Sequence, residues 1–301
     1  MKYFKNLYVS SSCLKKQKSI EQYLNIFLSN NIKNVELSGV HNHENLKQLG
    51  KKINYFKSKG MKLTFHNYFP APRKEMVLNL ISRNKKDYQL SEKLIKNSLK
   101  LAHDTGVNIY GFHPGYLKEG YIKNKKFYFK NLPYQNYERS YQVFVNRLTK
   151  IISENKKYLK NVQLSLENLF PLPKNKKISL MNNFNEIEKI FNIKIFKKNK
   201  LKLLLDLGHL EISSNLLKFD KNLELDKILK KYKNMINEVH LSGNNLIEDL
   251  HLRVKNNPWQ LEKLKLLKKK LKKNTIYVIE SRNLTIQQIV KDYKSISKIL
   301  K

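Results

Sequence analysis

Nine residues that could bind a metal ion occur at the ends of six strand-like apolar runs or in the loops just beyond them. The runs are KLTFH, NIYGFH, QLSLEN, LKLLLDLGH, INEVHLS and YVIES. The nine residues, which include five of the eight histidines, are His66, His113, Glu167, Asp206, His209, His240, Asp249, His251 and Glu280. One imidazole or carboxylate at a strand end is ordinary. Its recurrence on six strands indicates that the strands converge on one site and that this site binds metal.

Four of these residues come from the last four runs and form the principal predicted metal site: Glu167, Asp206, His240 and Glu280. Three carboxylates and one imidazole suit Mn²⁺, Mg²⁺, Co²⁺ or Zn²⁺ with positions open for substrate. Carboxylates held close together repel one another, and a divalent cation compensates. The alternative is that each residue is satisfied separately at a barrel rim. The presence of four such residues on consecutive strands favours the interpretation that they bind a metal ion together.

The other five residues allow two interpretations: they are His66, His113, His209, Asp249 and His251. They could hold a second and a third ion, up to three zinc ions in all. They could instead bind substrate hydroxyls or phosphate, or orient the principal ligands. Only one residue separates Asp249 from His251, so an extended segment would place both side chains on the same side.

The chain alternates strand-like runs with amphipathic helical stretches. LYVSS and NVELSG precede the six runs already named, which makes eight expected strands. The expected helices are Ile20 to Leu28, Leu46 to Phe56, Leu90 to Ala102, Tyr137 to Ile152, Phe184 to Phe191, Leu225 to Tyr232, one opened by Asn257-Pro258, and Ile286 to Leu300. Eight β/α units predict an α/β fold, a (β/α)₈ TIM barrel with outer helices, formed by residues 1–301 as a single domain. Chemistry in such barrels occurs at the carboxyl ends of the strands.

The composition of the chain indicates the cellular compartment in which we expect it. It has 301 residues, 41% hydrophobic, and one cysteine, Cys13, for which we expect a buried apolar environment. One cysteine allows no disulfide framework, which is typical of a reducing compartment. The first residues contain no apolar stretch of signal-peptide length, and no run approaches the roughly 20 apolar residues that cross a bilayer. We expect a cytoplasmic protein without membrane contact.

The formal net charge of +36 raises the question of a nucleic-acid partner. The excess is almost all lysine, and asparagine and isoleucine are also abundant; all three have A/T-rich codons. The lysines are scattered, and the densest cluster, residues 263–273, has leucines at helical spacing, as in a solvated helix face. Base composition does not explain the shortage of acids, so a polyanionic partner stays open.

Two long loops and one aromatic residue are candidates for contact with substrate. Residues 67–82 contain Arg73, a candidate substrate-binding residue, and residues 115–134 interleave aromatic residues with lysines. The second segment is either a lid over a sugar or phosphorylated substrate or a surface β-hairpin with arms YIKN and KFYFK. Trp259 is a candidate platform for stacking a sugar, with packing at a helix start as the alternative.

The order of the motifs HNYF…VLNLIS, GFHPG, LEN, DLGH, VHLSGN…DLH and VIES resembles the xylose isomerase-like TIM barrels. This superfamily includes the sugar isomerase/epimerase group and endonuclease IV. The resemblance extends over nearly the whole chain, and its metal motifs are specific as a set.

For the sugar branch, the resemblance implies a metal-dependent isomerase or epimerase that acts on a sugar or sugar phosphate through an enediolate. Glu167 and Glu280 would exchange the proton on opposite faces of the substrate carbon, and His209 would hold a hydroxyl or the oxyanion. The four-residue site would need one ion.

For the nuclease branch, the resemblance at all nine ligand positions implies an AP endonuclease that uses three zinc ions to cleave DNA at abasic sites. The chain departs from that pattern in its loops. LYVSSSC ends the first strand, FPAPRKEM follows His66, and LRVKNNPW follows His251. The nuclease uses the corresponding loops to grip DNA, so these departures favour the sugar branch. The oligomeric state is left open.

Overall fold

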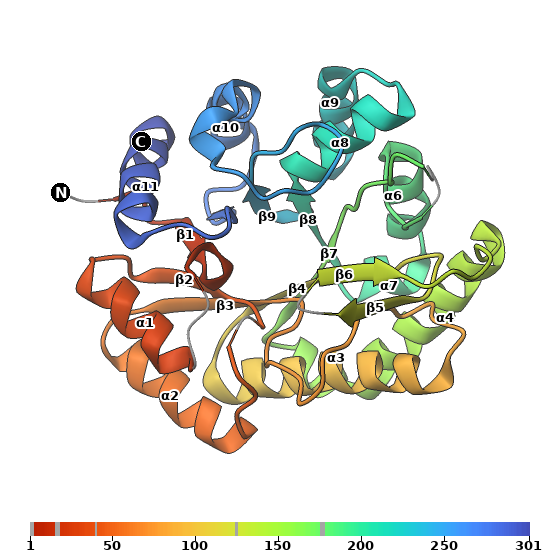
Figure 1. Ribbon diagram of the computed structural model, residues 1–301, viewed down its shortest axis with the longest axis horizontal. Coiled ribbons are helices and arrows are strands. Elements are labelled where there is room, and N and C mark those ends of the chain that lie inside the picture. The colour runs from red at the N-terminus through yellow and green to blue at the C-terminus, as the bar shows by residue number, and fades with distance from the viewer. Residues whose placement is uncertain (1–2, 16–18, 40, 124–125, 175–177) are drawn as a thin grey trace.

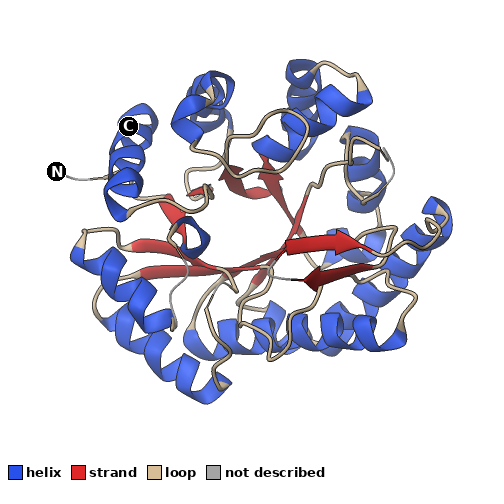
Figure 2. Cartoon of the chain, in the orientation of Figure 1, coloured by secondary structure: helices blue, strands red, loops and turns tan. Residues whose placement is uncertain are grey.

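Eight parallel strands close into a barrel in the order β1-β2-β3-β4-β7-β8-β9-β10, with β10 pairing with β1. The computed structural model describes residues 3–15, 19–39, 41–123, 126–174 and 178–301. The barrel strands are β1 (Leu7–Ser10), β2 (Asn34–Leu37), β3 (Lys62–His66), β4 (Ile109–Phe112), β7 (Gln163–Glu167), β8 (Lys202–Asp206), β9 (Ile236–Leu241) and β10 (Ile276–Ile279). Helices surround the barrel, which confirms the predicted (β/α)₈ fold (Figures 1 and 2).

The outer helices include all eight that the sequence predicts. They are α1 (Ile20–Ser29), α2 (Leu46–Ser58), α3 (Lys85–Thr105), α4 (Tyr137–Glu154), α5 (Lys156–Leu159), α6 (Phe184–Phe191), α7 (Lys194–Lys198), α8 (Leu207–Leu217), α9 (Lys221–Tyr232), α10 (Pro258–Lys270) and α11 (Ile286–Leu300). The helix expected from Leu90 begins earlier, because the Asn84 side chain accepts hydrogen bonds from the backbone N–H groups of Lys86 and Asp87. Such a cap satisfies N–H groups that have no partner within the helix.

The barrel interior has an apolar floor below a polar layer. Tyr8, Ile109, Ile276 and Val278 form a small buried cluster, separate from the main core that the outer helices share. Alternate residues of a strand point to the same face. Val278 therefore shares its face with Glu280. Glu280 consequently lies on the inward face of the barrel, above this apolar floor.

The end of β8 differs from the sequence prediction. The run LKLLLDLGH was expected to be one strand, but β8 ends at Asp206 and α8 follows at once. The Asp206 side chain caps α8 by accepting a hydrogen bond from the His209 N–H at 2.6 Å. His209 therefore lies in the first turn of a helix rather than at a strand end.

An antiparallel hairpin follows β4, formed by β5 (Gly120–Lys123) and β6 (Lys126–Phe129). It confirms the predicted hairpin for the described residues; Asn124 lies outside them. The Tyr116 ring packs against Phe127 and Phe129, with centroid distances of 5.4 and 5.7 Å. The Tyr116 hydroxyl lies 3.0 Å from His113 Nδ1, so side-chain contacts join the hairpin to the end of β4.

A helix needs about 20 mostly apolar residues to cross a lipid bilayer. Within the described ranges, no helix is both long enough and apolar enough to cross a membrane.

Candidate metal centre

The carboxyl ends of β3, β7, β8, β9 and β10 bring the four principal ligands and their neighbours together. The parallel register aligns Asp206 with His240, and His240 with Val278, two residues before Glu280. One potential ligand atom from each of Glu167, Asp206, His240 and Glu280 lies within 4.8 Å of the others. All four residues are buried. The sequence therefore identified a true spatial cluster.

His240 Nδ1 faces all three carboxylates of this group. It lies 3.0 Å from Glu280 Oε2, and 4.0 Å from both Asp206 Oδ2 and Glu167 Oε1. Divalent ions bind carboxylate oxygen and imidazole nitrogen at about 2.0–2.2 Å, so one ion can bridge atoms at these separations. The imidazole and the three carboxylates thus surround a common point.

Two carboxylate oxygens of the group lie where a cation would be favourable. Among the described residues, Glu167 Oε1 and Asp206 Oδ2 are buried and have no hydrogen-bond partner. Burial raises the pKa of Asp206 to about 6, and the charge of Glu167 acts in the same direction. A buried carboxylate oxygen without a partner is costly, and a divalent cation would supply the missing positive charge. The four side chains therefore form a donor set that could bind a metal ion.

His66 and His113 flank the other oxygen of Glu167. Glu167 Oε2 lies 2.7 Å from His66 Nε2 and 3.1 Å from His113 Nε2. Burial raises the pKa of Glu167, but His113 and His66 outweigh this effect and hold it well below its usual range. These three residues form a second group with metal-ligand spacing.

The remaining three predicted residues also meet at the barrel mouth. Asp249 Oδ2 lies 2.8 Å from His251 Nε2 and 3.7 Å from His209 Nε2. The segment is not extended as expected, because His251 has a φ of 47°. Asp249 and His251 nevertheless face each other, so the predicted proximity is right although the predicted backbone is wrong.

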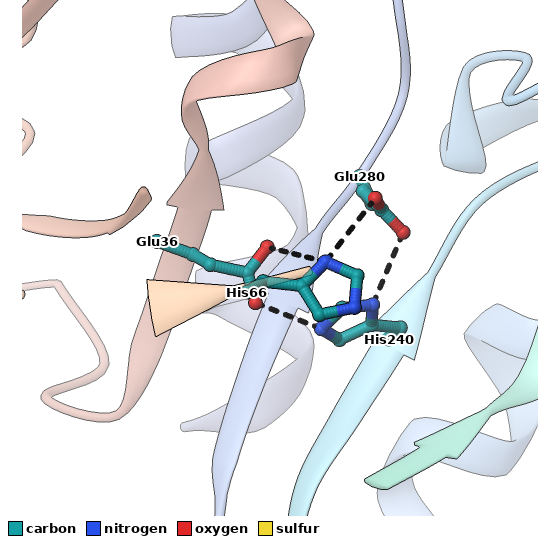
Figure 3. A group of neighbouring side chains, drawn as sticks. All are labelled: Glu36, His66, His240 and Glu280. Carbon is teal, nitrogen blue, oxygen red and sulfur yellow. Dashed lines mark hydrogen bonds and ion pairs between the residues drawn. The ribbon is translucent and has the colours of Figure 1, made fainter. Parts of the chain in front are cut away.

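Two buried acids in the barrel interior, Glu36 and Glu238, were not predicted as site residues. Glu36 Oε2 lies 2.9 Å from His240 Nε2, and Glu36 joins His66, His240 and Glu280 in a third group of closely spaced ligand atoms (Figure 3). Burial raises the pKa of Glu238 to about 7. A charged residue inside each apolar strand, NVEL and INEVHL, was the available signal.

Arg73 and Trp259 make their described contacts outside this cluster. Arg73 is exposed, and its Nε donates a hydrogen bond to His43 Nε2 at 3.3 Å. Trp259 packs against the core at the start of α10 and donates from Nε1 to the Asn222 side chain. These contacts match the packing alternative for Trp259. As expected, Cys13 is buried.

The fold and the cluster together define a parallel β/α barrel with a buried, carboxylate-rich set of side chains that could bind a metal ion. The sequence matches the profile of the family described as xylose isomerase-like TIM barrel over residues 35–259. The chain belongs to this family, as the motif order predicted. No curated protein matches the sequence.

Solved structures with the same fold include sugar epimerases and a nuclease. A D-tagatose 3-epimerase-like protein is 20% identical with a TM-score of 0.67, covering 98% of this chain and 97% of its own. A D-psicose 3-epimerase in the presence of D-fructose is 13% identical with a TM-score of 0.68, covering 98% and 99%. Endonuclease IV from Thermus thermophilus is 12% identical with a TM-score of 0.56, covering 98% of both chains. At these identities the likeness shows the fold alone.

Proposed function

We propose that this protein is a metal-dependent isomerase or epimerase of a sugar or sugar phosphate. The observation that carries the proposal is the placement of Glu167 and Glu280 around His240 Nδ1. These two glutamates lie at the ends of β7 and β10, which are separated in the barrel by β8 and β9. Two carboxylates that approach one point from different strands can remove a proton from one face of a carbon and return it to the other. The sugar epimerases among the structural neighbours support the same choice.

In the proposed reaction, one glutamate removes the proton from the carbon next to the substrate carbonyl. The electron pair of the broken C–H bond then forms the enediolate. The other glutamate returns a proton to the opposite face, which inverts the carbon. A bound divalent ion would polarise the substrate carbonyl. The residues that would hold this ion are Glu167, Asp206, His240 and Glu280. His209 holds a substrate hydroxyl or the oxyanion.

The exposed edge of the cluster indicates how a substrate approaches. The His113 and Asp249 side chains are 16% and 19% exposed, whereas those of His66, Glu167 and Glu280 are 6% exposed or less. The Phe170 ring lies 4.7 Å from the His209 ring beside this edge. Restricted access bordered by an aromatic ring suits a small sugar better than a DNA duplex.

The deciding experiment incubates the Mn²⁺-, Co²⁺- or Zn²⁺-loaded protein with ketoses, ketose phosphates and their aldoses in D₂O. We expect NMR to show deuterium at the carbon next to the carbonyl together with the epimer or isomer. Glu167→Gln and Glu280→Gln should each abolish both signals. Glu224→Gln, which changes a buried glutamate on α9, is the matched control and should leave both intact.

A second function, abasic-site nuclease, is favoured by one specific observation. All five additional residues lie at the barrel mouth in two groups. His66 and His113 flank Glu167, and Asp249 lies between His209 and His251. This arrangement supports a site with more than one zinc ion, as the nuclease alternative expects. Efficient incision of an abasic-site duplex that is lost in Glu167→Gln, with no deuterium exchange on any sugar, would replace the first proposal by this one.

A further inference from the structure

We propose that Glu36 is a positioning residue that fixes the tautomer and orientation of His240, so that His240 presents Nδ1 to the metal ion. This inference rests on the metal dependence of the proposed function. It concerns Glu36 on β2, a strand that contributes none of the nine predicted ligands.

The two nitrogens of His240 face different partners. Nε2 lies 2.9 Å from Glu36 Oε2, and both side chains are completely buried. Nδ1, on the opposite side of the ring, faces Glu280, Asp206 and Glu167. In a neutral imidazole one nitrogen carries the proton and the other a free electron pair. Nε2–H can donate to the Glu36 carboxylate at 2.9 Å, and with the proton held there the electron pair of Nδ1, now 3.0 Å from Glu280 Oε2, would be available to an ion.

The second oxygen of Glu36 faces a second histidine. Among the described residues, Glu36 Oε1 is buried and has no hydrogen-bond partner, and it lies 3.9 Å from His66 Nδ1. The same nitrogen lies 3.9 Å from Glu280 Oε1, and the other nitrogen of His66 contacts Glu167 at 2.7 Å. The rings of His66 and His240 lie 4.7 Å apart at an interplanar angle of 77°. Glu36 therefore contacts His240 directly and only approaches His66 (Figure 3).

Glu36 has a second conceivable role, as a ligand in its own right. Its carboxylate, His66, His240 and Glu280 offer ligand atoms within 4.8 Å of one another. That role would use Oε1, which lies 3.9 Å from His66 Nδ1, whereas the contact with His240 Nε2 uses Oε2. The 2.9 Å contact accounts for Nε2 without a second ion, so the geometry favours positioning.

Glu238 approaches the same nitrogen without forming a hydrogen bond. Glu238 Oε1 lies 3.7 Å from His240 Nε2, beyond hydrogen-bond range, and neither oxygen of Glu238 has a hydrogen-bond partner in the part of the chain that the structure describes. Glu36 is therefore the acid that orients the ring. Carboxylates that accept from a metal-bound imidazole typically contribute about 10- to 100-fold in metal affinity.

The test measures Zn²⁺ and Mn²⁺ binding to the full chain by competition with a chromophoric chelator, without any sugar. We expect Glu36→Leu to keep the number of bound ions and to weaken binding by about 10- to 100-fold. Glu36→Gln should lose less, because its amide oxygen can still accept from Nε2. Glu224→Gln controls for the loss of a buried carboxylate elsewhere. Unchanged affinity in Glu36→Leu, or the loss of one bound ion, would overturn the positioning role.

A measurement on the unaltered protein keeps the inference testable if the variants do not fold. In the Zn²⁺-loaded chain, ¹⁵N NMR of the histidine rings should show His240 protonated at Nε2 and metal-bound at Nδ1. A metal bond at Nε2 contradicts the proposal. Neither readout needs turnover, so a failed isomerase assay would reject the proposed function and leave both results interpretable.

Discussion

Asn168 holds the backbone of Asp206 with two hydrogen bonds. Its Oδ1 accepts from the Asp206 N–H at 2.8 Å, and its Nδ2 donates to the Asp206 carbonyl at 3.0 Å. Asn168 directly follows Glu167, and its own carbonyl accepts a hydrogen bond from His209 Nδ1 at 2.8 Å. One amide side chain thus fixes the relative positions of two proposed ligands on neighbouring strands.

Replacing Asn168 should therefore weaken metal binding as well as the fold. Asn168→Ala removes both buried hydrogen bonds and should lower the free energy of unfolding by about 1–3 kcal/mol. Metal affinity, measured by chelator competition, should fall by about tenfold. Asn182→Ala removes another buried asparagine, which bonds to Ser179, and should affect stability alone. Equal affinities in the two variants would contradict the link between Asn168 and the metal site.

Asp206→Asn separates the two roles of Asp206. The amide oxygen of asparagine can still accept from the His209 N–H and cap α8, because asparagine is as good an N-cap as aspartate. The proposed metal site, however, loses one of its three carboxylates. We expect circular dichroism to show unchanged helicity. Metal affinity should fall by more than about 100-fold, which exceeds the effect of losing a residue that only orients a ligand. Full metal affinity would remove Asp206 from the ligand set.

Divalent ions should stabilise the folded chain, since the proposed ligands converge only in the barrel. A free ion concentration of about 100 times Kd adds about 2.7 kcal/mol to the free energy of unfolding. For a chain of this size, this corresponds to a rise in Tm of about 5 °C over protein treated with EDTA. Differential scanning calorimetry should show the rise for Mn²⁺, Co²⁺ or Zn²⁺ but not for K⁺. The Asp206→Asn protein should show little of it.

Glu92 on α3 predicts a pH dependence of stability away from the metal site. Burial raises its pKa, but Lys96 and Lys150, with Nζ atoms 2.8 and 3.2 Å from Oε1, outweigh this effect and hold the pKa below its ordinary value of 4.5. A pKa that is lower in the folded state stabilises above the unfolded-state pKa, and this contribution is lost as pH falls through the folded-state pKa.

We therefore expect Glu92→Gln to reduce the free energy of unfolding by about 1 kcal/mol at pH 7. Denaturant titrations should show this difference shrinking below pH 4.5. Glu138→Gln alters a salt-bridged glutamate whose side chain is 67% exposed, and it should have little effect at either pH. A difference at Glu92 that grows with acidification would show that the pKa shift has the opposite sign.

The barrel and most of its site were predictable because the signals are local. Strand periodicity and a polar residue at each strand end require only neighbouring sequence, and the barrel rule then brings the ends together. His209 was misplaced because an apolar run cannot show where a strand gives way to a helix. The cap that starts α8 depends on the side chain of Asp206, a residue that was interpreted only as a ligand.

Glu36 was not predictable in the same way. Its role depends on the distance to His240, a residue 204 positions away, and on burial that NVEL alone does not reveal. The roles of Arg73 and Trp259 rested on residue type, which does not specify which way a side chain faces. Whether these two contact substrate, and whether the β5–β6 hairpin covers it, stay predictions.

The contact between Glu36 on β2 and His240 on β9 also has a consequence for biosynthesis. It spans the junction where β1 meets β10, so it can form only after β9 has left the ribosome. Glu280, beside it, is synthesised later still. Contacts so distant in sequence tend to form slowly. A growing chain would therefore carry unpaired imidazoles and carboxylates until the barrel closes, and ion capture would report barrel closure.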